Sequence, residues 1–97
     1  MRILGIDPGL RSTGWGVIAI EDGRLQHIAN GAIQPKPSLA DAQRLCIIHH
    51  GLDAVIASHH PDQAAIEQIF VAKSAGSALR LGMARGVGLL VCGIHDL

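Results

Sequence analysis

Apolar residues in the first third of the chain fall into three short runs, with turn-forming residues between them. Residues 2–7 are mostly apolar and are followed by a Pro-Gly pair, which is typical of a buried strand and the turn that ends it. Residues 13–20 form a second apolar run. A Glu-Asp-Gly turn then leads into a third strand, residues 24–33, in which Leu25 and His27 alternate with polar neighbours. Three strands in close succession predict an antiparallel meander.

The remaining chain reads as helix, strand and helix. Two prolines mark a connector, after which Ser38 can cap a helix that ends near His60. The apolar face of this helix recurs every three or four residues: Ala42, Leu45, His49, Leu52 and Ile56. A strand over residues 63–70 follows this crossover, and a helical connection makes it parallel to its predecessor. Residues 77–94 predict a second helix. The pattern therefore predicts a single α/β domain over residues 1–97, with a mixed sheet.

Small residues form a stripe along the second predicted helix. Ala78, Gly82 and Gly86 follow one another at four-residue spacing. A glycine inside a helix costs about 1 kcal/mol relative to alanine, so we expect something to approach this stripe closely. The sheet or a second subunit would each account for it.

Composition narrows the class of protein. Eight Lys and Arg balance eight Asp and Glu, so net charge does not indicate a nucleic-acid partner, and such a contact would need a local basic patch. The two cysteines form no CxxC pair, which favours a reducing, cytoplasmic location. The longest uncharged run, residues 86–95, is well short of the roughly 20 apolar residues that span a membrane. We therefore expect a soluble protein without a membrane partner.

Two carboxylates stand at the ends of apolar strands. Asp7 ends the first strand, and Glu67 follows Ala64, Ala65 and Ile66. If these two strands are neighbours, the acids lie about 5 Å apart across the sheet. Like charges at that distance share a proton or a divalent cation, and Mg²⁺ held by carboxylates beside a phosphate is the usual solution. The pair therefore favours metal-dependent phosphodiester hydrolysis.

A purely structural role for each acid is the alternative interpretation. Asp7 could accept hydrogen bonds from the Ser12 or Thr13 amides in the turn, and Glu67 could pair with Lys73 or Arg11. The matched placement of both acids at strand ends favours the metal site. The six histidines are weaker candidates, because adjacent histidines on a helix point in different directions and no third ligand is placed to help.

Four motifs carry a resemblance to a known family. In chain order they are G-I-D-P-G at 5–9, T-G-W-G at 13–16, A-I-E-Q at 65–68 and S-A-L-R-L-G-M-A-R-G at 77–86. The order and spacing of these motifs resemble those of the RuvC family of bacterial Holliday-junction resolvases, which have an RNase H-like fold. The resemblance extends over essentially the whole chain. The resemblance implies that Asp7 and Glu67 are the first two acids of the catalytic set and bind Mg²⁺ or Mn²⁺.

The same resemblance implies partners and DNA contacts. It implies a homodimer that cuts a four-way DNA junction symmetrically in recombination and repair, together with the branch-migration proteins RuvA and RuvB, and with the last helix at the dimer contact. Phe70 would stack on a base at the junction centre, and Lys73 would contact a phosphate. Lys73, Arg80 and Arg85 together could form the local basic patch that net charge does not show; the alternative for each is a charge exposed to solvent. For Phe70, closing the core is the alternative role.

RuvC proteins are longer than this chain, and their C-terminal part carries a further strand, further helices and the last catalytic acids. His95 and Asp96 match no catalytic position of the family. We therefore expect weak or no activity from the 97-residue chain, and an uncovered sheet face that favours dimerisation or aggregation.

Two other functions fit parts of the pattern. The I-D-x-G turn followed by a hairpin also resembles the phosphate loop of actin-like and sugar-kinase ATPases, which would make this an ATP-binding fragment. The second alternative function is a non-catalytic module that binds junctions or dimerises. Such a module would bind a junction equally well after Asp7→Asn and Glu67→Gln.

Overall fold

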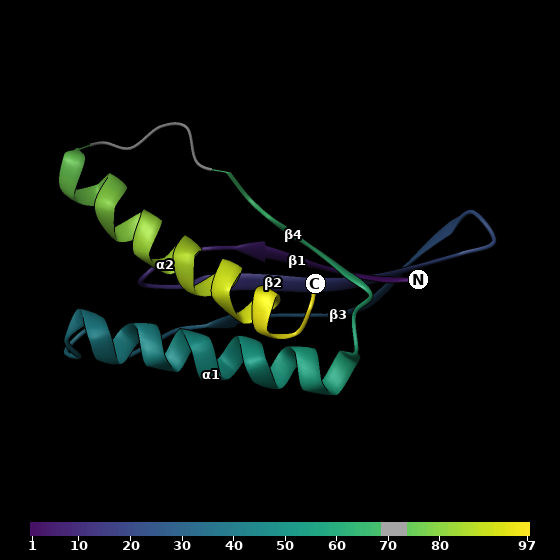
Figure 1. Cartoon of the computed structure of the whole chain (residues 1–97), viewed down its shortest axis with the longest axis horizontal. Coiled ribbons are helices and arrows are strands. Elements are labelled where there is room, and N and C mark those ends of the chain that lie inside the picture. Colours follow the sequence, from purple (N-terminus) through teal and green to yellow (C-terminus); the bar gives the residue numbers. More distant parts are fainter. Residues whose placement is uncertain (69–73) are drawn as a thin grey trace.

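A four-stranded mixed sheet carries both helices on one of its faces (Figure 1). The computed structural model describes residues 1–68 and 74–97. The elements are β1 (Arg2–Asp7), β2 (Thr13–Glu21), β3 (Arg24–Ile33), α1 (Asp41–His59), β4 (Gln63–Ile66) and α2 (Ala75–Ile94). The strand order is β3-β2-β1-β4, with β4 parallel to β1 and the other neighbours antiparallel. The predicted α/β architecture, a meander followed by a helical crossover to a parallel strand, is confirmed.

The turn of the β2–β3 hairpin forms as the sequence predicts. The side of β3 that meets the core differs from the predicted side. Asp22 and Gly23 both have positive φ, 51° and 73°, which suits the tight turn of a two-residue hairpin. A bulge opposite Val17 and Ile18 shifts the register, and Ile28 then packs against the core. The predicted alternation is therefore wrong. Leu25 is 73% exposed and His27 is also exposed.

Helix α1 buries part of the predicted face, Leu52 and Ile56, but the rest of the buried face differs from the prediction. Its buried residues are Ile48, Leu52, Val55 and Ile56. Of the predicted positions, Leu45 packs at the edge of this core, His49 is half-buried and Ala42 is exposed. Ser38 does not cap the helix, because α1 begins at Asp41 with Ala40 as the capping residue and no side-chain cap. The apolar face is centred about one residue away from its predicted position.

Glycine 51 lets α1 approach the end of β3. A Cβ at Gly51 would lie 2.6 Å from Cδ1 and 2.7 Å from Cγ1 of Ile33. We expect Gly51→Val to destabilise the fold by about 1–3 kcal/mol through overpacking, as measured by urea denaturation. Ala54→Val, on the exposed side of the same helix, is the matched control. Equal stability of the two variants would show that this contact does not limit packing.

Helix α2 begins two residues before the predicted start and is capped by a serine, and its small-residue stripe faces away from the sheet. Ser74 is the N-cap, and its Oγ accepts a hydrogen bond of 3.1 Å from the Ser77 amide. Gly88 faces the sheet, where a Cβ would contact Ile66 at 3.5 Å. A Cβ at Gly82 or Gly86 would meet nothing within 4 Å. The sheet is therefore not what the stripe approaches.

By length and composition alone, α2 is apolar enough to cross a membrane. It also carries Arg80 and Arg85, and it buries Ala84, Val91 and Cys92 against the rest of the domain. A helix that packs one apolar face on a protein core has the same composition, so length and hydropathy do not argue for a membrane span here.

The C-terminal end of α2 is tied to α1 by a polar contact. His95 Nε2 lies 2.6 Å from Asp53 Oδ1. This hydrogen bond, together with the positive charge of a protonated His95, lowers the pKa of Asp53 below its ordinary value. The contact holds the two helices together at the end of the domain away from β1's carboxyl terminus.

Candidate active site

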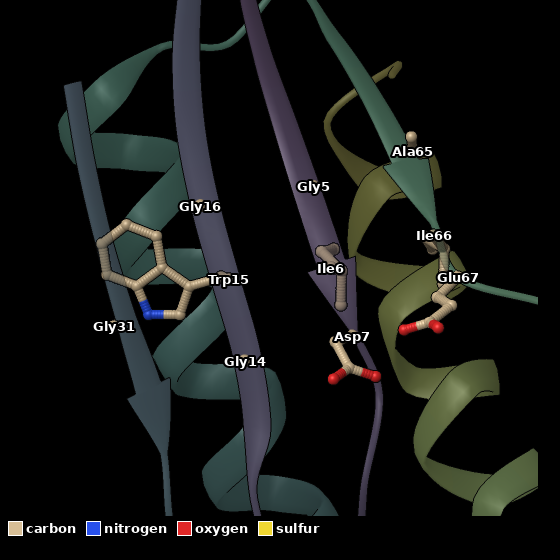
Figure 2. Close-up of a pocket in the computed structure, with 10 residues that line it drawn as sticks. All are labelled: Gly5, Ile6, Asp7, Gly14, Trp15, Gly16, Gly31, Ala65, Ile66 and Glu67. Atoms are coloured by element: carbon tan, nitrogen blue, oxygen red, sulfur yellow. The ribbon is translucent and has the colours of Figure 1, made fainter. Parts of the chain in front are cut away.

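Asp7 and Glu67 lie next to each other at one edge of the sheet. Asp7 is the last residue of β1, and Glu67 directly follows β4. The parallel register pairs Ile6 with Ile66, and the Glu67 amide donates a 2.9 Å hydrogen bond to the Ile6 carbonyl oxygen. The two acids therefore occupy the next pair of positions in register. Figure 2 shows both carboxylates at the ends of their strands, on the same side of the sheet.

The register that pairs the acids is fixed at the opposite end of the strands. The Arg2 amide donates a 2.8 Å hydrogen bond to Asp62 Oδ2, and the Arg2 guanidinium donates one of the same length to the His59 carbonyl oxygen. Both contacts join the start of β1 to the segment that leads into β4. Because side chains alternate along a strand, a slip of one residue would send Asp7 and Glu67 to opposite faces.

Glycines form the surface beside the two acids. The acids line an open groove of about 530 Å³ together with the backbone of β1, β2 and β4. Gly5, Gly14 and Gly16 line it, and a Cβ at Gly14 would lie 3.7 Å from the Asp7 Cβ. Figure 2 shows these positions without side chains next to the carboxylates. A ligand as bulky as a sugar-phosphate backbone can therefore come close to the acids.

Trp15 also lines this groove, but it packs mainly as a core residue. Its ring covers Gly31, where a Cβ would lie 2.9 Å from the ring, and it lies partly buried against the core cluster. Core packing of Trp15 accounts for this position better than stacking on a ligand.

The two carboxylates interact strongly enough to change protonation. Hydrogen bonding to the Asp7 carboxyl, then the like charge of Asp7, raises the pKa of Glu67 above its ordinary value of 4.5. Among residues 1–68 and 74–97, no third His, Cys, Asp or Glu joins them in a cluster able to hold a metal. Two exposed carboxylate oxygen donors suit a hard cation such as Mg²⁺, which keeps several of its waters and needs few protein ligands.

The raised pKa of Glu67 predicts a pH dependence of stability. Between pH 4.5 and that raised pKa, the folded chain binds more protons than the unfolded chain, so its free energy of unfolding falls as pH rises. In Glu67→Gln we expect this decline to disappear. Urea denaturation of both proteins from pH 4 to pH 7 measures the difference. Identical pH profiles would show that the two carboxylates do not interact.

The alternative structural roles of the two acids find no support in the described residues. No hydrogen bond there joins Asp7 to the Ser12 or Thr13 amides. Instead, the buried Thr13 hydroxyl holds the turn by donating a 2.7 Å hydrogen bond to the Gly9 carbonyl oxygen. Arg11 forms no ion pair with Glu67, because the ion pair found within residues 1–68 and 74–97 is His95–Asp53. The other partner considered for Glu67, Lys73, lies outside the described residues.

The predicted DNA contacts are only partly placed. Phe70 and Lys73 lie outside the described residues. Arg80 is exposed in the first turns of α2 and does not line the groove that holds the acids. Arg85 lies closer, with Nε 3.4 Å from the Glu67 carbonyl oxygen. The sequence analysis did not predict that Thr13 holds the turn after β1. The only sign of this role in the sequence is a polar residue at the start of an apolar strand.

Comparison with known proteins identifies the family. The family model described as "Crossover junction endodeoxyribonuclease RuvC" matches residues 3–95. The chain belongs to the RuvC family. RuvC of Paramagnetospirillum magneticum is 57% identical over 91 residues, covering 94% of this chain and 55% of that protein. RuvC of Rhodopseudomonas palustris strain TIE-1 is 52% identical, covering 100% and 56%. The chain thus spans about half the length of the curated relatives it matches.

Solved structures agree with this assignment. Thermus thermophilus RuvC superposes with a TM-score of 0.88 at 25% identity, covering 100% of this chain and 60% of that one. The T. thermophilus RuvC structure described as a complex with Holliday junction substrate gives 0.87 at 26% identity, covering 95% and 56%. The RNase H-like fold predicted from the motifs is therefore confirmed.

More distant likenesses concern the fold alone. An Aquifex aeolicus Ppx/GppA enzyme has a TM-score of 0.57 at 17% identity, covering 100% of this chain and 34% of that one. This likeness shows that the sheet architecture is shared outside the RuvC family. It does not argue for the ATP-binding alternative, because membership of the RuvC family rests on the match along nearly the whole chain.

Proposed function

We propose that this chain forms part of a structure-selective endonuclease that resolves four-way DNA junctions by metal-dependent phosphodiester hydrolysis, in recombination and repair. Asp7 and Glu67 are the proposed catalytic and metal-binding residues, with Mg²⁺ or Mn²⁺ as the cofactor. The observation that carries the proposal is the parallel pairing of β1 with β4, which brings the two carboxylates together beside an open groove. The names of the RuvC relatives, all crossover junction endodeoxyribonucleases, support the same substrate.

The residues present fit the chemistry of the bound cation. A divalent metal there would polarise the phosphodiester and activate water as the nucleophile. The two carboxylates would hold it at the edge of the sheet, and its charge would relieve their repulsion. The glycine surface would let the DNA backbone lie close to Asp7. Two carboxylates hold a cation weakly, so we expect these 97 residues alone to cleave slowly.

An apolar face on α2 supports the proposal of a homodimer. The small residues Gly82 and Gly86 share this exposed side of the helix with Leu79 and Leu90, which are 69% and 57% exposed. Small residues let two helices approach closely, and exposed leucines gain from being covered. With the resemblance to RuvC, this face supports a second copy of the chain as the occupant. Action in the cytoplasm together with RuvA and RuvB, without a membrane, belongs to the same proposal.

Cleavage of a synthetic four-way junction tests the proposed function. We expect the purified chain to bind the junction more tightly than a linear duplex of the same sequence. We expect slow cleavage that requires Mg²⁺ and is lost in Asp7→Asn. Asp22→Asn, which removes an acid at the far hairpin, is the matched control. Fast symmetric cleavage would show that two acids suffice, whereas junction binding without any cleavage would favour a non-catalytic module.

A further inference from the structure

Three arginines from three separate elements surround a second pocket. Arg11 comes from the turn after β1, Arg44 from the first turns of α1 and Arg80 from the first turns of α2. The pocket has a volume of about 330 Å³, and Gly9, Leu10, Ser77 and Leu81 complete its lining. The chain as a whole has no net charge, so this cluster is a local concentration of positive charge.

The charges in this pocket are not neutralised by neighbouring acids. Within residues 1–68 and 74–97, none of the three arginines forms an ion pair with a carboxylate. Arg44 is held in place by hydrogen bonds that its guanidinium donates to the carbonyl oxygens of Pro37 and Leu39. Arg11 and Arg80 are exposed. Three arginines, one with a fixed guanidinium group and two exposed, therefore line the same pocket, an arrangement that suits a bound anion.

The start of α2 adds to the positive character of the pocket. Ser77, in the first turn of the helix, lines the pocket, and the helix dipole favours an anion at this end. Guanidinium groups bind phosphate oxygens through paired N–H donors, which makes arginine well suited to phosphate. The three arginines therefore suit a phosphate group better than a cation.

The position of the pocket relates it to the two acids. The turn that carries Gly9 and Arg11 begins directly after Asp7, and α2 begins a few residues after Glu67 along the chain. The carboxyl ends of β1 and β4 and the first turn of α2 lie toward the same end of the domain in Figure 1. DNA that reaches the acids would therefore also pass this end of the domain.

We propose that the pocket formed by Arg11, Arg44 and Arg80 binds a backbone phosphate of the DNA whose cleaved phosphodiester lies at Asp7 and Glu67. The inference rests on the proposed function, since it takes DNA as the ligand. The DNA would then be held at a site on the helix-bearing side of the sheet, separate from the groove that holds the acids. Arg11 and Arg80 supply exposed donors, and Arg44 a fixed one.

Salt-dependent binding of a four-way junction tests the proposal. Affinity is measured in EDTA, without metal, over a range of salt concentrations for the parent chain and for Arg11→Ala/Arg80→Ala. We expect the double variant to bind on the order of tenfold more weakly at low salt. The slope of log K against log salt should fall by about two, because two contacts to the phosphate backbone are lost. The control is the single variant Arg24→Ala at the start of β3, compared with Arg11→Ala and Arg80→Ala singly.

Each outcome decides between specific explanations. A smaller slope in Arg11→Ala and in Arg80→Ala, but not in Arg24→Ala, supports the pocket. Equal losses in all three would overturn it, because they would indicate a diffuse effect of charge. Junction binding that is unchanged in the double variant would overturn the pocket while leaving the proposed function intact. Absence of junction binding by the parent chain would overturn the proposed function as well.

A free phosphate is the other source of the same ligand chemistry. The melting temperature of the parent chain is therefore also measured with inorganic phosphate. A rise that depends on Arg11 and Arg80, without any binding of the junction, would overturn a DNA strand as the ligand. Circular dichroism of every variant checks that its fold is retained, and we expect this because no hydrogen bond of the Arg11 or Arg80 side chain is present among the described residues.

Discussion

The Asp7→Asn variant is expected to lose the rise in melting temperature that Mn²⁺ gives the parent chain. A cation that binds only the folded state stabilises it by mass action. At ten times its dissociation constant, it raises the melting temperature of a domain of this size by roughly 6–11 °C. The two carboxylates supply the protein ligands and the repulsion that the cation relieves. Without Asp7, one ligand and that repulsion both disappear.

Thermal unfolding followed by circular dichroism, with and without Mn²⁺, measures this effect. Glu67→Gln should behave like Asp7→Asn, and both variants should melt at or above the melting temperature of the metal-free parent at neutral pH. Asp62→Asn is an unsuitable control because Asp62 binds the Arg2 amide, so Asp22→Asn serves instead. A Mn²⁺ response that survives in both Asp7→Asn and Glu67→Gln would place the metal elsewhere and remove the main support for hydrolysis.

The Leu52→Ala variant is expected to lose about 2–5 kcal/mol of stability, the largest effect of any single truncation proposed for this fold. Leu52 is fully buried on α1 and belongs to the cluster that joins both helices to the sheet. Removing its side chain leaves a cavity that the surrounding residues fill only in part. Small domains are stable by about 5–15 kcal/mol, so the variant would lose a large share of its stability.

Urea denaturation compares Leu52→Ala with a matched leucine on the surface. Leu25 is 73% exposed on β3, and Leu25→Ala should change the free energy of unfolding by no more than about 0.5 kcal/mol. Similar losses in the two variants would mean that α1 does not pack on the sheet through Leu52.

Much of the fold follows from signals that act locally. Pro-Gly after Asp7, Asp-Gly in the hairpin and Pro61 after α1 stop their elements where the structure stops them, because each residue type restricts or frees the backbone dihedrals at its own position. The parallel direction of β4 was also predictable, since a helical crossover from a meander returns a parallel strand to the same sheet. That β4 lies beside β1, which brings Asp7 to Glu67, was a condition that the structure supplies.

Other features depend on contacts that the sequence pattern does not contain. The bulge at Ile28 changes which residues of β3 meet the core, and nothing in the residues around it marks the shift. The buried face of α1 follows from where Ile33 and the sheet lie, so it differs from the face that Ala42 and His49 suggested. The arginine pocket joins residues 11, 44 and 80, which only tertiary structure brings together.

The pairing of β1 with β4 has a consequence for the order of folding. The meander brings together residues close in sequence, but Asp7 meets Glu67 only after the chain between them has formed α1 and delivered β4 to the edge of the sheet. Long-range pairings of this kind close a large loop and tend to form late. A cation held by both acids would then act on the native state and hardly on the transition state, so it would slow unfolding and leave the rate of refolding nearly unchanged.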